Sequence, residues 1–444
     1  MTDTPLGWLG IARLGLVQSA IGAIVMLATS LLNRVMVVEY ALPAALPAGL
    51  VAWHYAVQLT RPAWGHGSDR GRRRTPWIVI GMGTLALGAL LAVDAVALLA
   101  AGSVVGIPLA ILGYAMIGAG VGAAGTSLLA LLATRVAPER RAAAAAITWI
   151  MMVAGIAITA GVAGALIDPF SLRRLAIVAG GVAGAAVLVA TLAVWGVEGR
   201  APRMAMPEHG PHQESFGIAL RAMLTDPEAR RFTAFVFLSM LAYSMQDLIL
   251  EPFAGLMFGF TPGQSTQLSG VQHGGVLAGM ILAGIGGSAF GGRAAARLRY
   301  WIVGGCIGSA CALAGLAFAA QMGAGWPIAA NVALLGFANG VFAVAAIGTM
   351  MALAGGGERG GVGGGGREGM RMGVWGAAQA IAFGLGGLIG AVGVDLGRAW
   401  IGSTGATFTI VFLVESLLFL AAAALALRAP ARDRGAMRAR TVTT

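Results

Sequence analysis

The chain has 444 residues, of which 58% are hydrophobic and only 11% are charged, and its mean hydropathy is +0.83. Soluble domains carry about 25% charged residues, so this composition excludes an ordinary soluble protein and indicates an integral membrane protein. The net charge of +11 does not indicate nucleic-acid binding, because the basic residues, all of them arginine, gather between the apolar runs.

Twelve apolar runs predict twelve membrane-spanning helices, since a helix needs about 20 apolar residues to cross a bilayer. We therefore expect an all-α, polytopic membrane protein. No cleavable signal peptide is expected, because residues 1–10 lack a basic start and the first apolar run is long enough to remain as a span. The predicted spans cover residues 12–33, 45–60, 77–100, 108–134, 143–166, 174–196, 232–257, 269–291, 300–320, 327–353, 372–396 and 404–427.

The arginines are distributed asymmetrically between the two ends of these spans. With the N-terminus placed in the cytoplasm, 25 of the 29 arginines fall in inward-facing segments. The outward ends carry only Arg34, Arg173, Arg174 and Arg398. Because basic residues are retained on the cytoplasmic side, we expect a multi-pass inner-membrane protein (cytoplasmic or photosynthetic membrane) with both termini in the cytoplasm.

A long polar stretch after the sixth span divides the chain into two halves. A shift of 219 residues superimposes four residue types at equivalent points of the halves, which supports parallel six-helix repeats. These pairs are Pro43 and Pro262, His54 and His273, Gly65 and Gly284, and Arg74 and Arg293. The predicted units are an N-terminal six-helix bundle (1–196), a cytoplasmic linker with a short amphipathic helix (197–231), a C-terminal six-helix bundle (232–428) and a basic cytoplasmic tail (429–444).

The segment GHGSDRGRRR (65–74) resembles the loop motif G-x-x-x-D-R-x-G-R-R of the major facilitator superfamily. The matching residues are Gly65, Asp69, Arg70, Arg73 and Arg74, and the later glycine is displaced to position 71. Glycine permits a tight turn, aspartate is favourable at a helix N-terminus, and arginines reach carboxylates or anionic lipid headgroups. An ordinary basic inner loop is the alternative. The resemblance implies two pseudo-symmetric six-helix bundles.

Four further stretches resemble a narrower group, the bacteriochlorophyll delivery family, whose named members are PucC and LhaA. The resemblance extends from about residue 6 to residue 428. It implies a role in assembling light-harvesting complexes, with a (bacterio)chlorophyll or a precursor as ligand and with antenna polypeptides and pigment-synthesis enzymes as partners. The stretches are NRVMVVEYALPAALP (33–47), RPAWGHGSDRGRRRTPW (61–77), QDLILEPFAGLMFGF (246–260) and MGVWGAAQAIAFGLGG (372–387).

Two acids, Asp247 and Glu251, lie four residues apart and share one face of the predicted seventh span. The first span runs in the same direction and brings Arg34 and Glu39 to the same outer level. Because spans 1 and 7 face each other in facilitator folds, we predict an outer clasp in which Arg34 pairs with Asp247 or Glu251. Two alternatives stay open: Asp247 carries protons, as acids within membranes often do, or these side chains extend to the membrane interface.

Five residues are candidates for contact with the pigment that the family resemblance implies. His54 and His273 occupy matched repeat positions, and a neutral imidazole suits the axial position of a chlorophyll magnesium. Gly274 and Gly275 would leave room for a flat macrocycle. The eleventh span adds one face with Trp375, Gln379 and Phe383. The alternative roles are structural, as hydrogen-bonded core histidines and helix-packing residues. No protein metal site is expected beyond the pigment's own magnesium.

Three functions from different classes remain compatible with these observations. The first is a membrane assembly factor that binds or delivers (bacterio)chlorophyll. The second is a proton-coupled secondary transporter of a small hydrophobic or amphipathic solute, and the third is a ligand-free membrane scaffold. An enzyme is not expected, because no nucleophile, base and orienting group occur in a recognisable arrangement. Asp94 in the third span and Glu415 in the twelfth have no partner that the sequence identifies.

Overall fold

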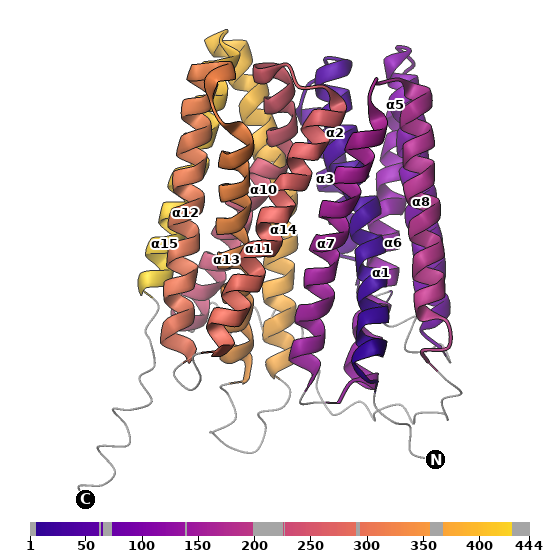
Figure 1. Cartoon of the computed structure of the whole chain (residues 1–444), viewed down its shortest axis with the longest axis vertical. Coiled ribbons are helices and arrows are strands. Elements are labelled where there is room, and N and C mark those ends of the chain that lie inside the picture. Colours follow the sequence, from indigo (N-terminus) through magenta and orange to yellow (C-terminus); the bar gives the residue numbers. More distant parts are fainter. Residues whose placement is uncertain are drawn as a thin grey trace, which may run out of the picture.

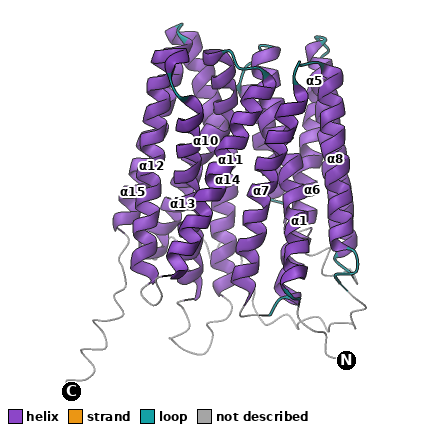
Figure 2. Ribbon diagram, viewed as in Figure 1, coloured by secondary structure: helices purple, strands orange, loops and turns teal. Residues whose placement is uncertain are grey.

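The computed structural model describes residues 6–61, 64, 73–137, 140–198, 225, 227–289, 294–355 and 367–428. Within these residues every regular element is a helix, as Figure 2 shows. The long helices run along roughly one direction in a single bundle, some in front of others (Figure 1). The predicted all-α polytopic fold is therefore confirmed.

The first half contributes six helical rods to the described chain. Its first rod is helical from Trp8 to Glu39, although two of its segments are wound as π-helix. The elements are α1 (Trp8–Met26), η1 (Leu27–Leu31), α2 (Leu32–Arg34), η2 (Val35–Glu39), α3 (Ala45–Gln58), α5 (Thr75–Ala100), α6 (Gly106–Arg135), α7 (Arg141–Ile167) and α8 (Leu172–Val194).

The second half contributes another six rods within the described residues. A short 3₁₀ turn, η4 (Gly323–Gly325), connects two of them. The helices are α10 (Pro227–Phe258), α11 (Pro262–Ala289), α12 (Ala294–Met322), α13 (Ile328–Gly355), α14 (Arg367–Ile401) and α15 (Thr404–Arg428).

Ten of the described helical rods are long and apolar enough to cross a membrane. The other two of the twelve are α3 and α11. The helix α3 has only 14 residues, and α11 has 28 residues but carries three glutamines and a histidine, which lower its hydropathy. Both lie against the opposite half of the protein, where polar side chains find protein partners instead of lipid.

Local sequence signals account for where several helices begin and end. The Ser171 side chain accepts a hydrogen bond from Arg174 N at 3.1 Å and so caps the start of α8. Gly259 follows α10 with φ 68°, a left-handed conformation that glycine adopts without steric cost. There the amide of Phe260 donates to the Ala254 carbonyl at 3.3 Å, which closes the last turn of α10.

The two halves have separate apolar cores and meet along two pairs of helices. One cluster of buried residues lies almost wholly within residues 11–197, and a second lies within residues 232–426. Across the junction, α7 packs on α11 and α3 packs on α14. These pairs are the fifth span with the eighth and the second with the eleventh, as expected for two repeats related by a pseudo-twofold axis.

The helices run between the two ends of the bundle, which we name by the chain segments that lie there. Both the start of α1 and the end of α15 lie at one end, which we call the terminal end (Figure 1). The opposite end, at which α5 finishes and α6 begins, is called the distal end. In the orientation predicted from the arginines, the terminal end faces the cytoplasm. The amphipathic helix predicted between residues 197 and 231 lies mostly outside the described residues, and the predicted domain limits remain predictions.

Glycines bring α5 and α6 into close contact. A Cβ atom at Gly88 would lie 2.7 Å from the Gly113 carbonyl oxygen and 2.8 Å from the backbone nitrogen of Ile117. A Cβ atom at Gly83, on the same helix, would meet nothing within 4 Å. Small residues thus set the distance between these helices, as is common in membranes.

We predict that Gly88→Ala destabilises the protein by about 1–3 kcal/mol, because the added methyl group overpacks the α5–α6 contact. Gly83→Ala is the matched control and should change stability by less than about 0.5 kcal/mol. Thermal unfolding of both variants in the same detergent, followed by tryptophan fluorescence, measures the difference. Equal unfolding midpoints for the two variants would contradict the close contact.

Candidate functional site

At the distal end, two carboxylates each bind the start of a helix in the opposite half. Asp395, near the end of α14, accepts hydrogen bonds from the backbone amides of Ala44 at 2.9 Å and Ala45 at 2.7 Å, at the start of α3. Asp168, which follows α7, accepts one from the amide of Gly263 at 3.1 Å, in the first turn of α11. Thr261 also donates its hydroxyl to Asp168.

These two contacts are related by the internal repeat. Ala44 and Gly263 are separated by the same 219 residues that superimpose Pro43 on Pro262. The first amides of a helix have no intrahelical acceptor, and the helix dipole favours a negative charge beside them. Each carboxylate therefore satisfies groups that the opposite half exposes. We call the pair Asp168 and Asp395, with the helix starts they bind, the distal latches.

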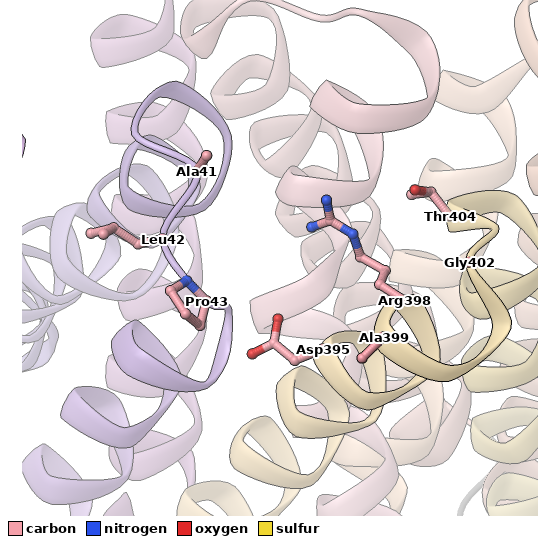
Figure 3. A pocket seen from close by; sticks show the side chains of 8 residues that line it. All are labelled: Ala41, Leu42, Pro43, Asp395, Arg398, Ala399, Gly402 and Thr404. Atoms are coloured by element: carbon pink, nitrogen blue, oxygen red, sulfur yellow. The ribbon is translucent and has the colours of Figure 1, made fainter.

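A cavity of about 490 Å³ lies beside the Asp395 latch (Figure 3). In Figure 3, Asp395 extends towards Pro43, whereas the guanidinium of Arg398 extends into the space between Ala41 and Thr404. The cavity therefore lies between the two halves at the distal end.

Arg34 is almost completely buried, with 1% of its surface exposed, and it also connects the halves. Its Nε donates to Ser265 Oγ of α11 at 3.0 Å, and Nη2 donates to the Phe260 carbonyl at 2.6 Å. Its ion-pair partner is Glu39 of the same helical rod. Arg34 thus connects the halves through hydrogen bonds to α11 and its preceding loop.

The predicted pairing of Arg34 with Asp247 or Glu251 was wrong. Among the described residues, neither acid lies within ion-pair distance of Arg34. The reason is the π-helical winding of η2, which brings residues five apart onto one face and so gives Arg34 an acid from its own rod. Nor do both acids approach the distal surface: Asp247 lies eleven residues, about 16 Å, before the end of α10.

Glu251 instead joins a buried polar cluster between the first rod and α11. It accepts hydrogen bonds from Ser30 and, at 3.3 Å, from Thr266. Ser30 also contacts Ser269 Oγ at 3.1 Å. One turn further along the first rod, Asn33 donates to the Leu248 carbonyl at 2.6 Å. All of these contacts cross between the halves or join the elements that meet there.

The two histidines at matched repeat positions have different surroundings. His54 is 2% exposed, and its Nε2 lies 2.7 Å from the side-chain nitrogen Nε2 of Gln58. His273 is partly exposed, and its Nδ1 lies 2.9 Å from the Ser269 carbonyl oxygen. A carbonyl only accepts, so Nδ1 carries the proton and a neutral His273 ring has its lone pair on Nε2.

Aromatic rings from both halves meet near the middle of the bundle. Phe383 of α14 lies 5.6 Å from Tyr55 of α3 and 5.7 Å from Tyr243 of α10, measured between ring centroids. All three side chains are partly exposed, as is Gln379 one turn before Phe383. The side chain of Trp375, the third residue of the predicted face, lies outside the described residues.

Two carboxyl groups beside this aromatic cluster have oxygen atoms without a hydrogen-bond partner in the described chain. Glu415 of α15 is completely buried, and neither of its oxygens has a hydrogen-bond partner among the described residues. Asp247 has one oxygen without a partner, while its carboxylate interacts with Gln272. Asp247 and Glu415 are close enough to interact electrostatically, and each lies eleven residues from the distal end of its helix. Acids at this depth mark proton or solute pathways.

Of the predicted loop motif, only Arg73 and Arg74 fall within the described residues; Gly65, Asp69 and Arg70 lie outside them. Arg74 donates to the Ala130 carbonyl at 2.6 Å and to Thr134 Oγ1 at 2.9 Å, in the last turns of α6. Glu198 accepts from the amides of Arg74 at 2.5 Å and Thr75 at 3.0 Å, at the start of α5. These contacts connect elements of one half only.

Sequence reasoning missed the distal latches and Ser265. A signal was present for the latches: each acid comes at or near the distal end of a span, and each bound helix begins close to a proline, Pro43 or Pro262. The two prolines are 219 residues apart and superimpose under the repeat shift, but Asp168 and Asp395 do not superimpose under that shift.

Comparison with known proteins places these features in a family. Residues 31–433 match a family described as PUCC protein. The bacteriochlorophyll synthase 44.5 kDa chain of Rhodobacter capsulatus is 52% identical over 437 residues, covering 98% of this chain and 99% of the relative. The protein PucC of Rhodobacter capsulatus is 29% identical, covering 95% of this chain and 92% of the relative.

Solved transporter structures share the fold. The nucleoside transporter NupG superimposes with a TM-score of 0.67 at 14% identity, covering 94% of this chain and 99% of the transporter. An inward-facing, unoccupied bacterial homologue of the lysosomal transporter Spinster gives a TM-score of 0.67 at 16% identity, covering 96% of this chain and 98% of the homologue. At these identities the likeness concerns the fold alone, and it confirms the predicted major facilitator architecture.

We predict that the double variant Asp168→Asn and Asp395→Asn opens the distal end. Each asparagine lacks the negative charge that stabilises a helix start by about 1 kcal/mol per contact. The ratio of molecules with an open distal end to molecules with a closed one should therefore rise about tenfold or more. Spin labels at Val104 and Trp400, which are 80% and 81% exposed on different halves, report the opening as a longer distance by pulsed electron resonance. Cys306 and Cys311 are first replaced by alanine.

Glu198→Gln is the matched control for the latches. It removes the same charge from a helix start, but within one half and at the terminal end. Its distance distribution should equal that of the unmodified protein. An unchanged distribution in the double variant, or the same change in Glu198→Gln, would contradict the latch.

Proposed function

The chain belongs to the PUCC protein family, and from that premise we propose that it is a membrane assembly factor that binds (bacterio)chlorophyll and delivers it to photosynthetic complexes. The relative that is 52% identical is named as a chain of bacteriochlorophyll synthase, which supports a link to this pigment. The transporter fold favours a non-catalytic role beside such a synthase. In this proposal the pigment is cargo that the protein passes on.

The observation that carries this proposal is the environment of His273. Histidines that ligate metals usually donate their second ring nitrogen to a backbone carbonyl or carboxylate, which fixes the ring. His273 makes this contact through Nδ1 to Ser269 and keeps Nε2 for a ligand. Beside it, a Cβ atom at Gly274 would meet nothing within 4 Å. The residue therefore fits the role of axial ligand to the magnesium of a chlorophyll.

We propose that the cargo lies between the two halves, and the position of His273 supports this. Ser269, one turn before His273 on α11, contacts Ser30 of the first rod, and residues four apart share one helix face. The partly exposed rings of Tyr55, Tyr243 and Phe383 supply aromatic surface from both halves. His54 does not fit the same role, because its Nε2 contacts Gln58 and its unpartnered Nδ1 is buried. We therefore propose ligation by His273 alone.

The proposed setting follows from the same premise. We propose that the terminal end faces the cytoplasm, since the arginine-rich segments of the sequence gather there. Antenna polypeptides and pigment-synthesis enzymes in the photosynthetic membrane are the proposed partners, and the basic loops would contact anionic lipid headgroups.

We predict that His273→Ala lowers the affinity for bacteriochlorophyll about tenfold or more, the equivalent of roughly 1.4 kcal/mol, and that His54→Ala leaves it unchanged. Purified protein is titrated with pigment in detergent, and the shift of the pigment's long-wavelength absorption band measures binding. Added imidazole should restore part of the shift in His273→Ala by occupying the vacated axial position.

Equal affinity in the two histidine variants would contradict ligation by His273. Failure of the unmodified protein to shift the pigment spectrum at all would contradict pigment binding itself. The melting temperature of each variant, measured without pigment, separates loss of a ligand from loss of the fold.

A second candidate function, a proton-coupled carrier of a hydrophobic solute, is favoured by Asp247 and Glu415. Their unpartnered oxygens lie at one depth within the second half. If these groups exchange protons during a transport cycle, Asp247→Asn should abolish proton uptake into proteoliposomes that is driven by a gradient of added pigment or solute. Uptake is read with an internal pH dye. Unchanged uptake in Asp247→Asn, with Glu198→Gln as control, would contradict this candidate.

A further inference from the structure

Asp94 of α5 is an acid that the proposed function does not use. It is exposed, and no hydrogen bond or ion pair to it occurs within the described part of the chain. The helix α5 has 26 residues and ends at Ala100. Asp94 therefore lies about 9 Å before the distal end of its helix, at 1.5 Å rise per residue.

This depth places the carboxyl group inside the membrane. A helix of 26 residues is about 39 Å long, whereas the hydrocarbon layer is about 30 Å thick. With α5 centred, the layer extends about 15 Å to each side of the helix midpoint, and Asp94 lies within it. Lysine and arginine reach the interface with long side chains, but aspartate has only one methylene group. An unpartnered acid facing lipid at this depth is costly.

The surface around Asp94 has the pattern of a helix-docking face. Ile80, Leu87 and Asp94 recur at intervals of seven residues, and the first two are 66% and 57% exposed. A spacing of seven keeps side chains on one seam towards a neighbouring helix. Gly83 lies between them with open space at its Cβ position, which permits close approach of a second backbone. In Figure 1, α5 lies with α8 at the edge of the bundle farthest from the second half.

The two arginines at the start of α8, the helix that packs against α5, do not pair with this acid. Arg174, in the first turn of α8, donates to the carbonyl of Asp168. Arg173 is exposed at the distal end and forms no ion pair with Asp94. The charge of Asp94 is therefore left for a group outside the described part of the chain.

We propose that the face formed by Ile80, Gly83, Leu87 and Asp94 docks a membrane-spanning helix of a partner protein that carries a basic side chain about 9 Å below its distal end. The basic group pairs with Asp94, and apolar side chains pack along Ile80 and Leu87. An acid within the hydrocarbon layer favours such a helix, because a matching cation at the same depth offsets the cost of the exposed charge. This docking requires no pigment.

The test uses pigment-free, full-length protein in phosphatidylcholine liposomes. The probe is a synthetic leucine-rich transmembrane peptide with one lysine at the matching depth, and energy transfer between labelled protein and labelled peptide measures binding. We expect binding of the lysine peptide to weaken about tenfold in Asp94→Asn, in line with polar contacts of about 1–2 kcal/mol between membrane helices. A peptide with leucine in place of lysine should bind both proteins equally weakly.

A second variant separates the docking face from the mere presence of an acid. Leu112 of α6 is 52% exposed and lies six residues from the distal start of its helix, at the same depth as Asp94. The double variant Asp94→Asn with Leu112→Asp moves the carboxylate to another lipid-facing position. We expect this double variant not to restore binding of the lysine peptide, because the docking face on α5 still lacks its carboxylate.

Three results would overturn the inference. Equal binding of the lysine peptide by the unmodified protein and by Asp94→Asn would show that the acid selects nothing. Energy transfer between protein copies that Asp94→Asn abolishes would assign the face to a second copy of this chain. Loss of peptide binding when phosphatidylethanolamine is added would assign Asp94 to a lipid amine. Pigment titration of Asp94→Asn should match the unmodified protein, so this test fails or succeeds independently of the proposed function.

Discussion

The distal junction of the two halves depends on backbone amides that only the opposite half satisfies. A helix start leaves its first N–H groups without intrahelical acceptors, and the helix dipole favours a negative charge beside them. Asp395 provides acceptors for α3 and Asp168 for α11, each from the other half of the chain. Arg34 adds hydrogen bonds to uncharged acceptors between the same regions. The closed distal end is therefore a property of both halves together, and the residues between them take their places from it.

The helix α11 links this junction to the proposed cargo position. Its first turn carries a latch contact, its second turn contacts Arg34 and Glu251, and its next turns carry Ser269 and His273. A displacement of α11 at the distal end therefore also displaces the imidazole. In the proposed function, opening of the distal end would therefore be coupled to release of a bound pigment. The lipid-facing side of α5 lies away from this junction, so the proposed docking face and the proposed cargo position are on separate surfaces.

The agreement between sequence and structure follows the range of the interactions involved. Apolar runs depend on local chemistry, so the twelve rods in two pseudo-symmetric halves were predicted correctly. The partner of Arg34 was not, because the π-helical turn of η2 that brings Glu39 to it has no reliable sequence signal. The histidine pair shows the same limit. His54 and His273 are equivalent in the repeat, yet their contacts differ. A glutamine one turn after His54 occupies its Nε2, whereas a backbone carbonyl one turn before His273 binds Nδ1 and leaves Nε2 without a partner.

The sequence by itself determined the membrane class, the number of rods, their predicted direction from the arginines and the family, because hydropathy, charge asymmetry and motif spacing are read along one dimension. Only the tertiary structure decided which acids bind helix starts, which histidine is partly exposed with Nε2 unpartnered, and which acid faces lipid without a partner in the described chain. Those outcomes depend on the rotation of each helix about its axis and on contacts between residues as far apart as Ala44 and Asp395. A rotation of one residue, about 100°, exchanges a buried position for a lipid-facing one while leaving the hydropathy of the span unchanged.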